Sequence, residues 1–371
     1  MPCGRPLAVS CKGKKPPAGG FCVGEHGLEQ LKTMEFCGDT LRLIDQRLLP
    51  QRLCYVEIRT VQQVFDAILH MQVRGAPAIG VAAAYGMVLA AQQAPEEAFL
   101  AHCTVAAAHL RSARPTAVNL SWALERMLCT AKTVRNSAPA VRNAAMLQQA
   151  RAIEQEDVDA NARMGAHLLS LLWDGCGVLT HCNAGVLATT AYGTATSPFY
   201  LAQERGMHLR IYADETRPRL QGARLTAYEL HRAGMDVTLI CDNMAAVLMR
   251  EKQIDVVITG CDRVARNGDT ANKIGTYGVS ILCRHFGIPL YIAAPTSTID
   301  LQCPNGAHIP IEMRDGDEIR RIDGVPVAPA DVKVFNPSFD VTPHDHIAAI
   351  VTERGVVRPP YTENLHKLLM Q

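Results

Sequence analysis

The sequence lacks several patterns that identify common classes of protein. None of its 13 cysteines forms a Cys-x-x-Cys pair, and no Gly-x-Gly-x-x-Gly fingerprint occurs in the chain. The first absence argues against a clustered zinc site and a disulfide framework, and the second argues against a dinucleotide cofactor. We therefore expect free thiols in a reducing cytosol, with no metal and no organic cofactor.

Long hydrophobic runs and a strong charge of either sign are also missing. An alanine-rich stretch at residues 78–90 is interrupted by Gly80, Tyr85 and Gly86 and is too short to span a bilayer. The formal net charge is +1, so no overall field favours nucleic acid or an anionic membrane. Residues 1–33 contain Pro and Gly but no hydrophobic segment of a secretory signal, and we expect a disordered extension there.

The length of 371 residues is sufficient for two domains. Helical patterns dominate the first part of the chain, and short apolar runs then alternate with helical patterns. We predict an α/β protein with a small, mostly helical N-terminal domain at residues 34–155, which includes a connector helix, and a doubly wound parallel sheet within residues 156–371. The predicted strands of the sheet lie at residues 178–180, 209–213, 237–241, 256–259, 290–293 and 332–335. Before them we predict a strand or hairpin near residues 41–44 and helices at residues 61–72, 77–90, 96–111, 120–134 and 140–172.

The stretch from residue 255 to residue 278 has the features of a ligand site. A β-branched run at residues 256–259 predicts a buried strand, and a polar loop follows it. From Lys273 the spacing of apolar residues becomes helical, so Asp262 should follow a strand and the pair Asn272 and Lys273 should begin a helix. The carboxyl end of a strand and the start of a helix suit a phosphate. The alternative is an ordinary crossover whose polar residues are solvated.

Two loops of the N-terminal region carry an arginine beside a predicted helix start. Arg74 and Gly75 precede Ala76 and Pro77, and Pro77 fits the first turn of the following helix. The free backbone amides there could bind an anion, although such a pair is also common in a simple turn. Arg114 lies in a second loop, in which we predict Asn119 as the N-cap of the next helix.

Polar residues follow all six predicted strands of the sheet. The segments lie at residues 181–185, 214–222, 241–243, 260–262, 295–298 and 336–340. Because the carboxyl ends of parallel strands meet at one edge of the sheet, these segments should gather there. This concentration of Cys, Asp, Asn and Arg predicts an active site.

Six stretches of the chain, taken in order, resemble the S-methyl-5-thioribose-1-phosphate isomerase family. They are RGAPAIG at residues 74–80, SARPTAVNL at residues 112–120, HCNAG at residues 181–185, ETRP at residues 215–218 with QG at residues 221–222, GCDR at residues 260–263, and NGD at residues 267–269 with NKIGT at residues 272–276. The resemblance extends from about residue 34 to the C-terminus and leaves out the first 33 residues.

The resemblance implies an aldose–ketose isomerase of the methionine salvage pathway, acting on a small sugar phosphate without cofactor or metal. It implies a helical N-terminal domain, a Rossmann-like catalytic domain, a homodimer, and a location in the cytoplasm and also the nucleus. The catalytic residues would be Cys182 and Asp262. Substrate contacts would come from Arg74, Gly75, Ala76, Arg114, Gln221, Asn272 and Lys273. The same superfamily contains ribose-1,5-bisphosphate isomerases and non-catalytic regulatory subunits of the translation initiation exchange factor, and both remain alternatives.

The implied reaction requires an acid and a group near C2 of the sugar. The ring of a ribose 1-phosphate has to open, and hydrogen has to move between C2 and C1 while the phosphate stays attached. Desolvation would raise the pKa of Asp262 into a useful range, and Cys182 could hold a thiolate at a helix start. Proton abstraction through an enediol and hydride transfer in a dry site are both open.

Overall fold

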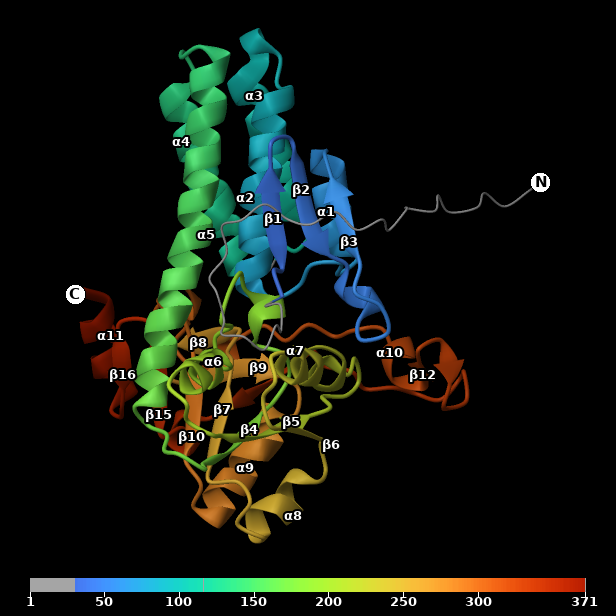
Figure 1. The fold of residues 1–371 in the computed structure, drawn as a ribbon, viewed down its shortest axis with the longest axis vertical. Coiled ribbons are helices and arrows are strands. Elements are labelled where there is room, and N and C mark those ends of the chain that lie inside the picture. The colour runs from blue at the N-terminus through green and yellow to red at the C-terminus, as the bar shows by residue number, and fades with distance from the viewer. Residues whose placement is uncertain (1–30, 116, 371) are drawn as a thin grey trace.

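The structure is a computed structural model that describes residues 31–115 and 117–370. The predicted disordered extension over residues 1–33 lies outside the described residues, except for residues 31–33. Figure 1 shows an upper part that consists mainly of helices and a lower part built on a sheet. The described helices include none that is long and apolar enough to cross a membrane.

The upper part packs helices against a small antiparallel sheet of order β1-β2-β3. Its elements are β1 (Met34–Cys37), β2 (Thr40–Ile44), β3 (Tyr55–Ile58), α1 (Val61–Leu69), α2 (Ala76–Gln93), α3 (Phe99–Ser112) and α4 (Val118–Val134). The early hairpin and the first four of the five helices predicted before the sheet are thus present. Helix α2 is buried on nearly all sides, because small residues such as Gly80 and Gly86 allow the neighbouring helices to approach closely.

A long helix, α5 (Pro139–Leu169), connects the two parts. Its first half contributes Met146 and Ile153 to the core of the upper part, and its second half contributes Met164 and Leu168 to the core on one face of the lower sheet. The predicted boundary at residue 155 falls inside this helix, and the division into two domains stays a prediction.

The lower part is a seven-stranded sheet of order β16-β15-β10-β7-β4-β5-β6. Its strands are β4 (Gly177–Thr180), β5 (Arg210–Asp214), β6 (Val237–Ile240), β7 (Val256–Thr259), β10 (Leu290–Ala293), β15 (Ala349–Thr352) and β16 (Gly355–Val357). All neighbours are parallel except β15 and β16. The predicted α/β fold with a parallel sheet is confirmed.

Helices cover both faces of this sheet and create two apolar cores. One core receives side chains from α5, α6 (Ser197–Glu204) and α7 (Ala227–Arg232). The other receives side chains from α8 (Ala245–Arg250), α9 (Thr276–Phe286) and α11 (Tyr361–Met370). Burial of the sheet on both faces explains why its strands read as short, continuous apolar runs.

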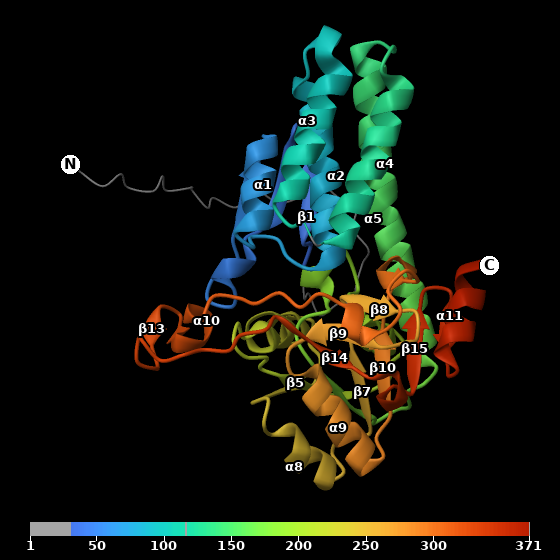
Figure 2. The same cartoon turned by 180° about the vertical axis from the view of Figure 1, so that it is seen from behind.

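A second, smaller sheet of order β11-β8-β9-β14 lies beside the carboxyl edge of the main sheet (Figure 2). Its strands are β8 (Arg263–Ala265), β9 (Thr270–Lys273), β11 (Ile299–Asp300) and β14 (Phe339–Thr342). A projecting segment between β11 and β14 contains α10 (Asp317–Arg320) and a two-stranded hairpin of β12 (Arg321–Ile322) and β13 (Val325–Pro326).

Three local predictions are wrong. Residues 332–335 form no strand, and Phe335 is 78% exposed; β15 occupies the predicted position of a sixth strand beside β10. The helix predicted from Lys273 begins at Thr276, because residues 270–273 pair with β8 and β14. Asn119 is not an N-cap, since α4 begins one residue earlier and is capped at Ala117.

Candidate active site

The candidate site lies where the carboxyl edge of the main sheet meets the start of α2. Gly75 joins the two, since it has a φ of 93° and a Cβ at this position would lie 2.4 Å from the carbonyl oxygen of Ala188. A residue with a side chain would therefore push α2 away from the loop that follows β4. Gly75 and Ala76 are both half-buried at this junction, and Ala76 begins α2.

Cys182 follows β4 in a strained backbone conformation. Its φ is 66°, a region that residues other than glycine seldom adopt, and the neighbouring loop has Thr216 at a φ of 63°. The amide of Cys182 donates to Oγ1 of Thr216 over 2.8 Å, and its carbonyl oxygen accepts from the hydroxyl of Thr226 over 2.7 Å. These contacts hold the half-buried thiol in one orientation.

The prediction that Cys182 lies at a helix start is wrong. The next helical element along the chain is a short 3₁₀ turn at Val186–Ala188, so Cys182 does not begin a helix. Burial raises the pKa of Cys182, although the positive charges of Arg74 and Lys273 oppose this. The thiol is therefore neutral near pH 7, and the expected thiolate is not supported.

Arg74 connects the start of α2 to the Cys182 loop. One terminal nitrogen of its guanidinium donates to the carbonyl oxygen of Asn183 over 2.8 Å and also to the side-chain oxygen of Asn183. Its Nε is buried and has no hydrogen-bond partner within residues 31–115 and 117–370. Burial lowers the pKa of Arg74, opposed by Cys182, Glu229 and Asp262. A buried guanidinium with a free donor is suited to bind an anion.

Asp262 follows β7 and is in electrostatic contact with three of the predicted substrate residues. Desolvation raises the pKa of its carboxyl, while Lys273, Arg74 and Arg114 lower it. The residue is nevertheless exposed to solvent, so we expect the increase in pKa to become larger when a substrate excludes water. The pKa of Asp262 is thus raised, as expected from the sequence, but the groups around the carboxyl are cationic rather than apolar.

The remaining predicted residues also border this region. The ammonium group of Lys273 donates to the carbonyl oxygen of Ser338 over 2.9 Å and lies 4.3 Å from the ring centroid of Phe339. Asn272 is buried and donates to the hydroxyl of Thr276. Gln221 is buried, and its side-chain oxygen has no partner among the described residues. Their roles in binding substrate stay predictions.

His181 is a buried residue of the site that the sequence did not single out. Its Nδ1 lies 2.9 Å from a carboxylate oxygen of Asp214, and its Nε2 lies 2.9 Å from the carbonyl oxygen of Ile274. Both partners are acceptors, so the pair of His181 and Asp214 holds one proton more than a neutral imidazole beside a carboxylate. Burial alone lowers the pKa of His181, but these hydrogen bonds raise it overall. The contacts tie the end of β4 to Ile274, which directly follows Lys273 at the end of β9.

His181, Asp214 and Asp242 have ligand atoms within 4.8 Å of one another, a grouping that is invisible in the sequence because three strands contribute to it. The carboxylate of Asp242 accepts the amides of Thr216 and Arg217, each over 2.7 Å. The ring of His181 is bound on both nitrogens. Both ring nitrogens of His181 and both oxygens of Asp242 are thus engaged within the protein, which argues against a metal site, and the one oxygen without a partner among the described residues is Oδ1 of Asp214.

Glu229 is a second buried group that the sequence did not single out. It lies on α7, is 2% exposed, and accepts the amide of Leu187 over 3.0 Å, while its other oxygen has no partner among the described residues. Burial raises its pKa to about 7, against the opposing effects of hydrogen bonds and of Arg74. The sequence could have indicated its burial, because Glu229 lies four positions after the core residue Leu225 and therefore on the same face of a helix.

This pKa predicts a pH dependence of stability. The folded protein keeps the proton of Glu229 up to about pH 7, whereas the unfolded chain loses it near the ordinary glutamate pKa of 4.5. Stability should therefore fall as pH rises through this window, by up to roughly 3 kcal/mol for this group. The free energy of unfolding, measured with denaturant, should decrease less from pH 5 to pH 8 in Glu229→Gln than in the wild type. Equal losses in both proteins would contradict the assignment.

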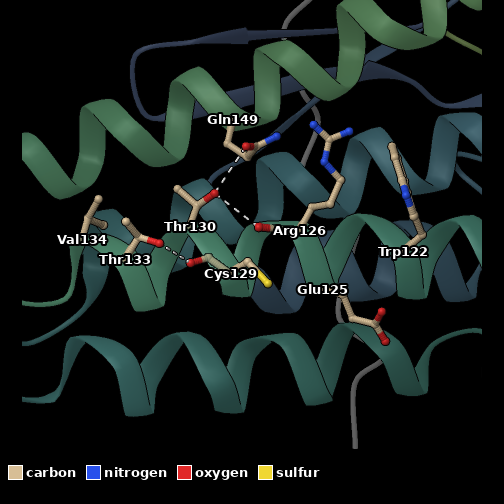
Figure 3. A pocket seen from close by; sticks show the side chains of 8 residues that line it. All are labelled: Trp122, Glu125, Arg126, Cys129, Thr130, Thr133, Val134 and Gln149. Atoms are coloured by element: carbon tan, nitrogen blue, oxygen red, sulfur yellow. Dashed lines mark hydrogen bonds between the residues drawn. The ribbon is translucent and has the colours of Figure 1, made fainter.

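Two hollows differ in size and in chemistry. A hollow of about 430 Å³ lies on α4 and α5 (Figure 3), and Thr130 donates across it to Gln149 over 3.4 Å. It contains none of the predicted site residues. A much smaller hollow at the edge of the main sheet is lined by Gln221 and Lys273. The smaller one is the better candidate, because the cations and the strained loop are nearby.

Comparisons with known proteins add independent information. The model of the Initiation factor 2 subunit family matches residues 72–359. A 5-deoxyribose 1-phosphate isomerase of Bacillus cereus is 54% identical over 344 residues, covering 92% of this chain and 99% of that protein. The crystal structure of 5-methylthioribose 1-phosphate isomerase from Pyrococcus horikoshii OT3 is 44% identical, with a TM-score of 0.88 over 92% of this chain and 97% of the other. A translation initiation factor eIF-2B subunit delta from A. fulgidus is 42% identical, with a TM-score of 0.85 over 92% and 100% of the two chains.

Proposed function

The chain belongs to the Initiation factor 2 subunit family and is a sugar-phosphate isomerase, and we propose that it converts S-methyl-5-thioribose 1-phosphate to S-methyl-5-thioribulose 1-phosphate. The observation that carries this proposal is the grouping of Cys182 and Asp262 with Arg74 and Lys273 at one sheet edge. A regulatory subunit would require neither the acid nor the thiol. The homodimer and the cellular location implied by the resemblance stay predictions.

A second candidate substrate is 5-deoxyribose 1-phosphate. The Bacillus cereus relative is named for it, and its identity to this chain is higher than that of the Pyrococcus structure named for the methylthio sugar. Both sugars have an uncharged group at C5 and differ only in the methylthio substituent. The chemistry at C1 and C2 is the same for both.

In this proposal Asp262 carries the proton. Its carboxyl protonates the ring oxygen as the bond from C1 to that oxygen breaks, which leaves C1 electron-poor. A hydride then moves from C2 to C1, and the hydroxyl at C2 returns its proton to the carboxylate. The raised pKa of Asp262 supports this role, because an acid has to be protonated before the ring opens.

Cys182 acts through its sulfur atom in this scheme. The alternative enediol route needs a thiolate that removes the proton from C2, but burial raises the pKa of Cys182. A neutral thiol is a weak base, which favours the hydride route. Its soft, polarizable sulfur can stabilise the electron-poor C1, and this is the role that we propose.

The phosphate should be bound between Arg74 and Lys273, close to the free amides at the start of α2. Loss of a charge-assisted hydrogen bond to a bound anion costs roughly 1.5–3 kcal/mol. Arg74→Ala and Lys273→Ala should each weaken substrate binding by about ten- to a hundredfold. Binding measured by calorimetry should be unchanged in the controls Arg59→Ala and Lys132→Ala, whose side chains are exposed in the upper part. Unchanged affinity in both site variants would place the phosphate elsewhere.

The proposed substrate is tested by a direct comparison of three sugars. We expect turnover of 5-methylthioribose 1-phosphate and 5-deoxyribose 1-phosphate, with the higher kcat/KM for the methylthio sugar, and little turnover of ribose 1,5-bisphosphate. A higher kcat/KM for the deoxy sugar would favour the second candidate. Absence of turnover for all three would contradict the proposed function.

A further inference from the structure

The projecting segment between β11 and β14 places a carboxylate between two arginines. Glu318 on α10 lies 2.7 Å from a terminal nitrogen of Arg219 and 2.6 Å from one of Arg314. Nε of Arg314 lies 3.0 Å from each carboxylate oxygen, and the amide of Asn336 donates to Glu318 over 3.3 Å. The side chain of Glu318 is only 13% exposed. All the oxygen atoms of this carboxylate are therefore used within the group.

This group lines the same small hollow as two of the predicted substrate residues. Gln221 and Lys273 form part of the wall together with Arg219, Arg314 and Glu318. The ammonium of Lys273 interacts electrostatically with Cys182, Asp262 and Arg74, and also with Arg314. Lys273 is thus shared between the reacting groups and the Glu318 group. The C5 end of a ribose whose 1-phosphate is bound by Arg74 and Lys273 has to reach this hollow, of about 10 Å³, for Glu318 to act on its substituent.

The remaining walls of the hollow are suited to an uncharged substituent. Pro218, Ile274 and Pro337 contribute apolar surface. The two arginines would otherwise form a strong site for a phosphate, because paired guanidinium groups match its geometry and charge. Glu318 occupies both of them, and Glu312 adds a second carboxylate 3.4 Å from Arg314. The two carboxylates thus offset the charges of the two arginines and leave Lys273 as the uncompensated cation of the wall.

The carboxylate of Glu318 is ionised at any pH at which the enzyme would work. Burial alone would raise its pKa, but hydrogen bonds from Arg314 and Arg219 lower it to about 2. A second phosphate that entered the hollow would therefore meet a fixed negative charge and two arginines that are already bound. Like charges brought together in a site that excludes water repel each other strongly.

We propose that Glu318 is a specificity-determining residue that excludes ribose 1-phosphates with a second phosphate at C5 and admits those with an uncharged C5 substituent. This inference rests on the proposed function. It assigns to one carboxylate the distinction between the methylthio or deoxy sugars and ribose 1,5-bisphosphate.

The test is the substrate preference of Glu318→Gln. We expect kcat/KM for ribose 1,5-bisphosphate, divided by that for 5-methylthioribose 1-phosphate, to rise at least about tenfold, because the two arginines are released. The matched control is Glu312→Gln, which removes a carboxylate from the same Arg314 but at a position with 44% of the side chain exposed. The control should leave the ratio within about twofold of the wild type, since an exposed ion pair has little effect.

Further variants separate specificity from a structural role. Glu318→Met keeps the volume without a charge and should shift the ratio in the same direction. Addition of Arg219→Gln to Glu318→Gln should reverse most of the gain, because it removes a released cation. The proposal would be overturned if the ratio is unchanged in Glu318→Gln, or if kcat/KM falls equally for both sugars in this variant. Failure of both Glu318→Gln and Glu318→Met to fold would also overturn it. These outcomes are distinct from a wild type that does not turn over 5-methylthioribose 1-phosphate, which would contradict the proposed function itself.

Discussion

Asp262→Asn should reduce the turnover of 5-methylthioribose 1-phosphate by at least ~10²-fold, the usual contribution of a positioned acid–base group. The amide keeps the shape of the carboxyl and removes its titration. Binding should change little, since the phosphate is bound by other residues. The raised pKa also predicts the direction of the pH profile. If the protonated carboxyl opens the ring, wild-type kcat/KM should fall as pH rises through the pKa of Asp262, and the variant should lack this limb.

A suitable control is Asp255→Asn at the opposite end of the same strand. Asp255 accepts the amide of Gly177 over 2.8 Å and precedes β7, whereas Asp262 follows it. The control removes a negative charge from the other end of the same strand, and its turnover should stay within about twofold of the wild type, as expected for a change away from the reacting groups. Turnover of Asp262→Asn within that range would show that another group carries the proton.

Cys182→Ser should also lower turnover by roughly 10²-fold, the effect of removing one group that stabilises developing charge at the reacting centre. Oxygen is smaller and less polarizable than sulfur, so the hydroxyl should stabilise an electron-poor C1 less well. The competing explanation is that Cys182 is one more small buried hydrophobe. In that case the substitution would lower the stability of the protein and leave the turnover of the folded enzyme intact.

Cys283→Ser provides the comparison for this explanation. Cys283 lies on α9, is 1% exposed, and belongs to the core on the other face of the main sheet. Its substitution should destabilise the protein without changing kcat. Thermal unfolding and turnover measured on both variants therefore separate a catalytic cysteine from a structural one. If Cys182→Ser behaves like Cys283→Ser, the catalytic assignment is wrong.

The sequence predicts most of the main sheet because its strands are buried on both faces. Such strands are recognisable as continuous apolar runs, and their order along the chain places five polar segments at the carboxyl edge. The sixth polar segment is positioned by the smaller sheet and not by the main sheet. Residues 336–340 follow no strand of the main sheet; instead, β14 pairs with β9, and Ser338 accepts a hydrogen bond from Lys273.

The features that the sequence did not predict depend on contacts between distant parts of the chain. Strand β9 has a sequence that resembles the start of a helix, and its pairing with β14, about 65 residues later, decides its conformation. The proton shared by His181 and Asp214 depends on two acceptors, the carboxylate of Asp214 at the end of β5 and the carbonyl of Ile274 just after β9. Glu318 likewise contacts Arg219, which lies 99 positions earlier in the chain. Patterns over a few neighbouring residues carry no information about contacts between residues so far apart in the chain.

The most direct test of the central claim is the turnover of the double variant Asp262→Asn with Cys182→Ser. If the two residues act on one substrate in one step, the double variant should be little slower than the slower single variant, because groups that act as a unit are strongly non-additive. Single-turnover assays with 5-methylthioribose 1-phosphate and folded protein would measure this. Losses that multiply in the double variant would show that Cys182 and Asp262 act independently and would contradict the account.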